Sequence, residues 1–285
     1  AGPVETLHAG STGTAVVCLH GFPDTPHTFG RQIQVLADAG YQALAPSLRG
    51  YTPGLPAAPD NCHPLSAARD VLGLLDRLGI GRAHLLGHDW GAMLGYLLAA
   101  LAPERFASLT TSAVPHPLGW LRSMSGHPQQ LLSSWYMLFF QLPDLPERMV
   151  ASRGFLRWLW KRWSPGLEPP VAVFDALLAR FQEPAIVRAA LAYYRDSVRG
   201  SADLRMETET LLRAPIEVPT LAMFGAQDGC VRAPLFEAAM LGGDFREVRM
   251  HCLEQSGHFM HLEQPEAFEQ RLLDWLRTHP AVSGV

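Results

Sequence analysis

Short, largely apolar stretches alternate with amphipathic stretches over the N-terminal part of the chain. Thr14–Leu19, Tyr41–Pro46 and Ala83–Gly87 are three such apolar stretches. Runs of this kind suit strands that are buried on both faces of a parallel sheet. Because parallel strands are joined by right-handed crossovers, the alternation predicts the α/β class, a mostly parallel central sheet flanked by helices.

The same rhythm returns near the C-terminus after a long interruption. We predict strands at Val4–His8, Thr14–Leu19, Tyr41–Pro46, Ala83–Gly87, Leu109–Val114, Thr220–Phe224 and Arg246–Cys252, and helices at Pro26–Ala39, Pro64–Leu78, Gly91–Leu101, Ala233–Met240 and Pro265–Thr278. Between them, residues 117–213 carry helical segments, many prolines and aromatics, and no convincing strand. We therefore expect residues 1–116 and 214–285 to form one core domain, into which residues 117–213 insert a helical cap.

Composition excludes several classes of protein. The 285 residues are 48% apolar and 18% charged, with a formal net charge of −4, which is ordinary for a globular chain. This balance gives no reason to expect nucleic acid or an anionic membrane as a partner. The longest apolar run, Trp90–Ala102, is shorter than the roughly 20 residues of a membrane-spanning helix. We expect no membrane partner, and either a monomer or a homodimer.

Cysteine usage and the N-terminus bear on location. Cys18, Cys62, Cys230 and Cys252 fall at no repeating spacing, so we expect neither a disulfide framework nor a zinc site. The N-terminus has no basic stretch followed by an apolar one, and no signal peptide is predicted. Both observations favour a reducing, cytoplasmic location.

The segment Gly-His-Asp-Trp-Gly at residues 87–91 lies between a predicted strand and a predicted helix. Glycines at both ends allow the strained turn called a nucleophile elbow, which lifts the middle side chain above the sheet. That side chain is Asp89, where serine is more usual. The alternative is that Asp89 simply caps the following helix, as aspartates often do.

Two further residues favour the catalytic interpretation. Asp228 follows the predicted strand at residues 220–224, and His258 lies in the loop after the last strand. Nucleophile, acid and histidine then occur in the chain order expected of this fold, each at the carboxyl end of a strand. The backbone N–H groups of Phe22 and Trp90 are the predicted oxyanion donors.

Several motifs together resemble the epoxide hydrolase branch of the α/β-hydrolase family. They are HGFPD (20–24), RGYTPG (49–54), GHDWGA (87–92), VPHP (114–117), GAQD (225–228) and SGHF (256–259). The resemblance implies that two tyrosines of the cap donate hydrogen bonds to the epoxide oxygen, and it points to Tyr136 and Tyr194. The alternative for both tyrosines is core packing.

An aspartate nucleophile suits a substrate with an electrophilic saturated carbon, since attack there gives an alkyl ester that water can hydrolyse. The favoured function is hydrolysis of a hydrophobic epoxide to a vicinal diol, with Asp89 attacking and His258, oriented by Asp228, activating water. No cofactor and no metal is required. Haloalkane dehalogenation with the same nucleophile is the first alternative, and a non-catalytic ligand-binding homologue is the second.

Three other features were weighed for binding roles. His84 and His88 are about 13 Å apart if they lie on a strand, so we do not expect them to share a metal. His258 and His261 have helical spacing but no third ligand nearby in sequence. The basic, aromatic segment Arg153–Trp163 could contact a membrane, but its position in the insertion favours a cap helix.

Overall fold

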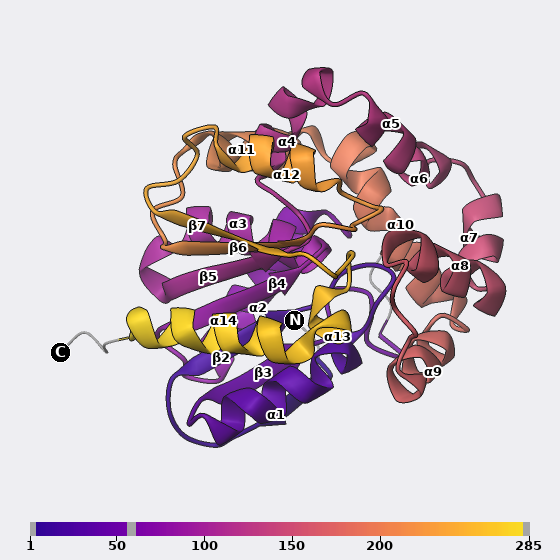
Figure 1. The fold of residues 1–285 in the computed structure, drawn as a ribbon. Coiled ribbons are helices and arrows are strands. Elements are labelled where there is room, and N and C mark those ends of the chain that lie inside the picture. Colours follow the sequence, from indigo (N-terminus) through magenta and orange to yellow (C-terminus); the bar gives the residue numbers. More distant parts are fainter. Residues whose placement is uncertain (1–3, 56–60, 282–285) are drawn as a thin grey trace.

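Seven strands form one sheet at the centre of the computed structural model, which describes residues 4–55 and 61–281 (Figure 1). The strands are β1 (Thr6–Ala9), β2 (Ala15–Leu19), β3 (Gln42–Pro46), β4 (Ala83–His88), β5 (Phe106–Ser112), β6 (Thr220–Gly225) and β7 (Val248–Leu253), in the order β1-β3-β2-β4-β5-β6-β7. The pairing of β1 with β3 is antiparallel, and the other pairings are parallel. The predicted α/β class is confirmed.

Helices cover both faces of the sheet. They are α1 (Gly30–Asp38) and α14 (Pro265–Thr278) on one face, and α2 (Pro64–Arg77), α3 (Trp90–Leu101) and α12 (Ala233–Met240) on the other (Figure 1). Strand β2 shows how one apolar run serves both faces. Val16 packs in the cluster with α1 and α14, whereas Val17 packs in the cluster with α2 and α3. This two-sided burial is why the strand lacks polar alternation.

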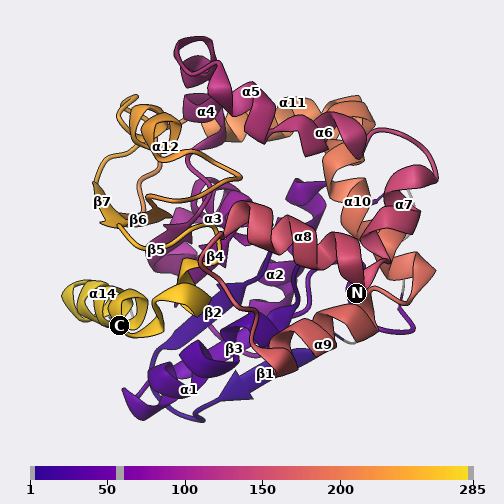
Figure 2. The same ribbon diagram turned by 45° about the vertical axis from the view of Figure 1, so that its right-hand side comes forward.

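The chain leaves the sheet after β5 and returns at β6. The intervening helices are α4 (Pro117–Ser123), η3 (Met124–Gly126), α5 (Gln129–Ser133), α6 (Trp135–Phe139), α7 (Leu145–Val150), α8 (Arg153–Trp163), α9 (Val171–Arg180), α10 (Pro184–Arg199) and α11 (Ala202–Arg213). Figure 2 shows α6 to α10 gathered beside one end of the sheet. The division of the chain into a core and a cap at residues 117 and 213 stays a prediction.

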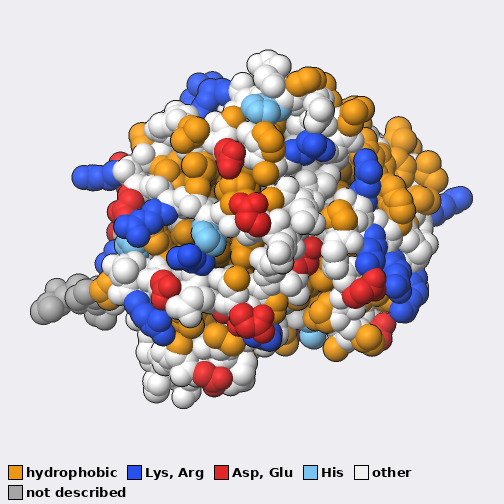
Figure 3. Space-filling view, in the orientation of Figure 1, with side chains coloured by type: hydrophobic (Ala, Val, Ile, Leu, Met, Phe, Trp, Pro, Cys, Tyr) orange, Lys and Arg blue, Asp and Glu red, His pale blue; other side chains and the backbone are white. Residues whose placement is uncertain are grey.

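Hydrophobic side chains are exposed on this inserted region. Leu131, Leu132 and Leu138 are all exposed, and Figure 3 shows orange side chains gathered over α6 and α7. Among the helices of the described residues, none combines the length and the apolar character that crossing a membrane requires.

Local sequence accounts for most helix boundaries. Proline occupies the first turn of α2, α10 and α14. Proline lacks a backbone N–H, and an N–H in the first turn would have no hydrogen-bond acceptor within the helix. Gly40 and Gly79 follow α1 and α2 with φ of 89° and 68°, the left-handed conformation of a helix C-terminus.

Two predicted boundaries differ from the structure by three residues or more. The predicted helix Pro26–Ala39 begins as a separate 3-10 turn, η1 (Pro26–Phe29), before α1. Strand β5 starts at Phe106 and not at Leu109, because its polar residues are buried and bonded across the sheet. Ser108, for example, bonds His84 Nδ1 over 2.8 Å.

The remaining short elements are η2 (Pro103–Arg105) before β5 and α13 (Met260–Glu263) after β7. Helix α13 connects the loop that contains His258 to α14. The carboxyl ends of β2, β4, β6 and β7 therefore lead into the segments that carry Phe22, Asp89, Asp228 and His258.

Candidate active site

Asp89 lies at a tight turn between β4 and α3, in a backbone conformation that non-glycine residues rarely adopt (φ 53°, ψ −117°). Two glycines allow the turn. A Cβ on Gly91 would overlap the carbonyl oxygen of Leu19, and one on Gly87 would overlap the carbonyl of Gly91. The Asp89 side chain makes no capping hydrogen bond to α3, which argues against a plain helix cap. The turn has the form of the predicted elbow.

The loop after β2 passes directly beside this carboxylate. The Phe22 N–H donates a hydrogen bond to Asp89 Oδ1 over 2.7 Å. A Cβ on Gly21 would overlap the Asp89 side chain, so only glycine permits this approach. The Phe22 amide thus contacts Asp89, as a predicted oxyanion donor should, and the Trp90 amide, at the first residue of α3, stays the second predicted donor.

His258 lies between the two aspartates that were predicted to accompany it. Its Nδ1 is 2.9 Å from Asp228 Oδ2, and its Nε2 is 3.5 Å from Asp89 Oδ2. Asp228 is itself held by the backbone, since its Oδ1 accepts the N–H groups of Cys230 (2.6 Å) and Val231 (2.9 Å). The structure therefore brings together three residues that are far apart in sequence.

The electrostatics of His258 reflect several acidic neighbours. Burial by itself lowers the pKa of His258, but Asp228, Cys230 and a hydrogen bond to Asp89 together raise it well above its ordinary value. The imidazole is fully buried. Its protonation therefore depends on the groups that surround it.

A cavity of about 290 Å³ opens over Asp89. Its walls are mostly apolar and include Met93, Val114, Trp120 and Leu121. Such a wall suits a hydrophobic small molecule, with the few polar groups fixing its orientation.

Tyr136 and Tyr194 also line this cavity, so both reach the same space as Asp89. Their ring centroids are 5.8 Å apart. Tyr194 also packs edge-on against Phe22 and Trp90, with centroid distances of 5.4 and 4.9 Å. Burial raises the pKa of both phenols well above its usual value, so both stay protonated hydrogen-bond donors. Tyr136 and Tyr194 therefore pack in the core and also line the cavity.

Cys230 is a neighbour that the sequence analysis did not assign to the site. Its Sγ is 3.3 Å from the Tyr136 hydroxyl, and it is fully buried. Burial raises the pKa of its thiol. Its position two residues after Asp228 was the signal that could have found it.

Helix α8 faces the site and not the solvent along its apolar side. Leu156, Leu159 and Trp163 are fully buried. The Trp163 carbonyl accepts the N–H groups of Gly229 and His258, and the Trp163 ring is 5.0 Å from the His258 ring. The segment predicted as a cap helix thus ends against the two loops that carry Asp228 and His258.

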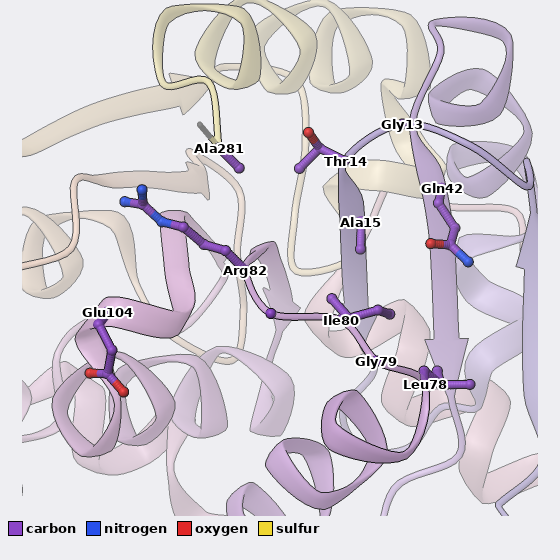
Figure 4. A pocket seen from close by; sticks show the side chains of 11 residues that line it. Gly13, Thr14, Ala15, Gln42, Leu78, Gly79, Ile80, Arg82, Glu104 and Ala281 are labelled. Carbon is purple, nitrogen blue, oxygen red and sulfur yellow. The ribbon is translucent and has the colours of Figure 1, made fainter. Parts of the chain in front are cut away.

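A larger hollow of about 860 Å³ lies at the opposite end of the strands (Figure 4). It is lined by residues at the start of β2 and β3, with Arg82 and Glu104 as its charged side chains. It contains none of the candidate catalytic residues. The smaller cavity is the better candidate site, because open α/β sheets bind ligands at the carboxyl ends of their strands.

Comparison with known proteins shows the family to which the chain belongs. The family described as alpha/beta hydrolase fold matches residues 14–265. Epoxide hydrolase A of Mycobacterium tuberculosis (strain ATCC 25618 / H37Rv) is 30% identical, over 96% of this chain and 94% of that protein. Epoxide hydrolase 2 of Siraitia grosvenorii is 34% identical, over 95% of each chain.

A solved structure agrees with these sequence matches. The crystal structure of a putative epoxide hydrolase from Klebsiella pneumoniae superimposes with a TM-score of 0.82 at 29% identity, covering 96% of this chain and 94% of that one. The similarity therefore includes the sheet and the inserted helices alike.

Proposed function

Because the chain belongs to the alpha/beta hydrolase family, in its epoxide hydrolase branch, and is a hydrolase, we propose that it converts an epoxide to a vicinal diol through an alkyl ester on Asp89. One observation carries the proposal. The Asp89 carboxylate lies 2.7 Å from the Phe22 amide and 3.5 Å from His258 Nε2, in a cavity that it shares with two phenols.

The two oxygens of Asp89 have different surroundings. Oδ1 accepts the Phe22 N–H, whereas Oδ2 faces His258. Oδ2 is therefore the attacking atom, since an oxygen that is already held by an amide is the poorer nucleophile. After attack, Oδ1 becomes the ester carbonyl oxygen, and the same amide polarises it for the second step.

Ring opening uses the tyrosines. As Oδ2 bonds to an epoxide carbon, the carbon–oxygen bond of the ring breaks and its oxygen becomes an alkoxide. Tyr136 or Tyr194 donates a proton to that alkoxide, and the phenolate later regains a proton from solvent. Both phenols are uncharged at neutral pH, which suits them to this role.

Hydrolysis uses His258. A water molecule gives one proton to Nε2 while its oxygen attacks the ester carbonyl carbon. Asp228, 2.9 Å from Nδ1, stabilises the imidazolium that forms. Collapse of the tetrahedral intermediate breaks the bond between the carbonyl carbon and Oδ2, and Oδ2 leaves as one hydroxyl oxygen of the diol after taking the proton from His258. The oxygen of the water stays on Asp89 in its place, and the new carboxyl group releases its proton to solvent.

Haloalkane dehalogenation is the second candidate, and one observation favours it. Trp90 lines the cavity, and its buried indole Nε1 has no hydrogen-bond partner among the described residues. An N–H in that position could hold a departing halide. The two cavity-facing phenols, which dehalogenation does not require, favour the epoxide.

The His258→Gln variant tests the proposal and separates the two candidates. Glutamine keeps a polar side chain but cannot accept the proton from water, so Asp89 should become alkylated once and remain so. With a styrene oxide-like epoxide, mass spectrometry should find the Asp89 peptide heavier by one whole substrate molecule. With a short haloalkane, the adduct would lack the halogen.

Asp89→Asn is the matched control. It should form no adduct and should lower turnover by about 10⁴-fold or more, while keeping an oxygen that accepts the Phe22 N–H. Diol formation by the wild type without any adduct in His258→Gln would mean that water attacks the epoxide directly. The covalent mechanism would then be wrong.

A further inference from the structure

Three metal-ligating side chains meet behind the candidate active site, away from the cavity. Asp24, His88 and His261 are each fully buried. One ligand atom of each side chain lies within 4.8 Å of those of the other two, and Asp24 Oδ2 is 3.9 Å from His88 Nδ1. Asp24 Oδ2, His88 Nδ1 and His261 Nδ1 have no hydrogen-bond partner in the described part of the chain.

The other polar atom of each side chain is already held by the protein. Asp24 Oδ1 accepts the Thr25 N–H over 2.8 Å. His88 Nε2 lies 3.0 Å from the His258 carbonyl oxygen. Because a carbonyl can only accept, His88 Nε2 carries the proton and Nδ1 carries a lone pair.

His261 is arranged in the same way. Its Nε2 bonds the Thr28 hydroxyl over 2.5 Å, and its buried Nδ1 has no partner among the described residues. An imidazole with one nitrogen anchored to a protein group and the other free is the usual arrangement of a metal-ligating histidine. Sequence spacing relates His88 to His84 and His261 to His258, and only the fold brings the rings of His88 and His261 to within 4.7 Å of each other.

An uncompensated convergence of this kind is costly. Buried polar atoms in native proteins nearly always have partners. A group bound between the three side chains would supply the partner that these atoms lack.

We propose that Asp24, His88 and His261 form a binding site for a divalent first-row transition metal, such as zinc, iron(II) or manganese(II). Two imidazoles and one carboxylate are a donor set that these metals use. Donors that share a metal at about 2.1 Å lie roughly 3.4 Å apart in tetrahedral geometry. Asp24 Oδ2 and His88 Nδ1, at 3.9 Å, would move closer together around such a metal.

The position of the site indicates what the metal does. Asp24 lies two residues after Phe22, His88 directly precedes Asp89, and His261 lies three residues after His258. A metal would thus join the three segments that carry the oxyanion donor, the nucleophile and the base. Because its ligands are sealed from the cavity, its role is structural, and substrate does not contact it.

Metal analysis of the intact protein tests this site. The chain is unfolded in urea, refolded with zinc, manganese(II) or cobalt(II), freed of excess metal and analysed by plasma mass spectrometry. We expect about one equivalent of metal to be retained per chain and the melting temperature to rise with metal during refolding. His261→Gln and Asp24→Asn should lose the metal and the rise in melting temperature.

His84→Gln is the matched control. His84 is also buried on β4, but its Nδ1 bonds Ser108, so this variant should retain the metal. Anomalous diffraction from crystals of the refolded protein locates the ion. Asp228, Cys230 and His258 form a second set of close donor atoms, and a metal found there would overturn the proposal.

Two other outcomes would also overturn it. The wild type, measured directly and so independently of how the variants fold, could retain no metal and keep its melting temperature. Alternatively, His261→Gln could retain as much metal as His84→Gln. In either case a buried water would be the occupant of this space. Neither outcome bears on the covalent mechanism, which the adduct on Asp89 tests separately.

Discussion

The two sides of the cavity are held in place by different kinds of contact. We call Phe22, Asp89, Asp228 and His258 the sheet side, and Tyr136 and Tyr194, with the cavity-lining residues Trp120, Leu121 and Met137, the cap side. On the sheet side, backbone N–H groups bond both carboxylates, and glycines leave no room for a side chain. On the cap side, the contacts are mainly between aromatic rings.

This difference affects what each side can tolerate. A backbone hydrogen bond or a glycine contact has one working geometry, so a small change there moves the reacting atoms. Apolar packing accepts swaps of similar volume at little cost. In the proposed mechanism, the sheet side therefore positions the reacting atoms, while the cap side shapes the space for the substrate and contributes only its two hydroxyl groups to the chemistry.

Removing the hydroxyl groups of Tyr136 and Tyr194 tests whether the cap side takes part in the chemistry. Tyr194→Phe should slow ring opening, and adding Tyr136→Phe should lower it by about 10²- to 10³-fold in total, because no donor then reaches the alkoxide. The rate of adduct formation on Asp89, followed by rapid quenching and mass spectrometry, measures this step.

Tyr193→Phe is the control, since it removes a buried hydroxyl next to Tyr194 in sequence. That hydroxyl donates to the Arg49 carbonyl over 3.1 Å and does not line the cavity. Its loss should cost about 1 kcal/mol of stability and leave ring opening unchanged. A near-wild-type rate of ring opening in the variant that lacks both the Tyr136 and Tyr194 hydroxyl groups would show that these tyrosines serve only in packing.

Substituting alanine for Gly91 and for Gly126 compares how well the sheet and the inserted region tolerate an added side chain. Gly91→Ala places a Cβ against the Leu19 carbonyl and should destabilise the fold by more than about 3 kcal/mol, because backbone must move. Gly126→Ala, in η3 of the inserted region, meets nothing within 4 Å and should change stability by less than about 1 kcal/mol. Urea unfolding measures both. Equal midpoints for the two variants would contradict the comparison.

The pH dependence should come from the sheet side alone. His258 must be neutral to accept a proton, and esterification of Asp89 removes one of the hydrogen-bond partners that raise the pKa of His258. Below the remaining pKa, diol release should slow about tenfold per pH unit while ring opening continues, so the ester accumulates as pH falls. The phenols, with raised pKa values, should add no step between about pH 5 and 9.

Quenching the reaction at several pH values and weighing the protein gives the fraction that carries the ester. A fraction that stays constant with pH would show that His258 does not limit hydrolysis. A fraction that rises with pH would point to a different base.

The features of the fold and of the candidate site that depend on short stretches of sequence could be predicted. The turn at Asp89 follows from two glycines between a strand and a helix, all within five residues. The approach of Asp228 and His258 follows from a general rule, since parallel strands bring their carboxyl ends to one edge. The roles of these residues are still predictions that the experiments above address.

Features set by side-chain packing across the fold were not predictable. The contact of Cys230 with Tyr136 joins residues 94 apart, and that of Thr28 with His261 joins residues 233 apart. The early start of β5 depended on polar side chains that find partners only once the neighbouring strand is in place. Periodicity reports which face of an element is apolar, and it carries no information about which polar groups will meet.

The arrangement of β5 beside β6 has a consequence for the protein while it is being made. These strands are neighbours in the sheet, yet β5 ends at Ser112 and β6 begins only at Thr220. At a synthesis rate of about 5–20 residues per second, roughly 5–20 s pass before the ribosome supplies the partner of β5. During that interval the edge of β5 that later pairs with β6 has no partner strand. Such an edge can pair with another chain, so we expect the nascent protein to bind chaperones that cover exposed strand edges.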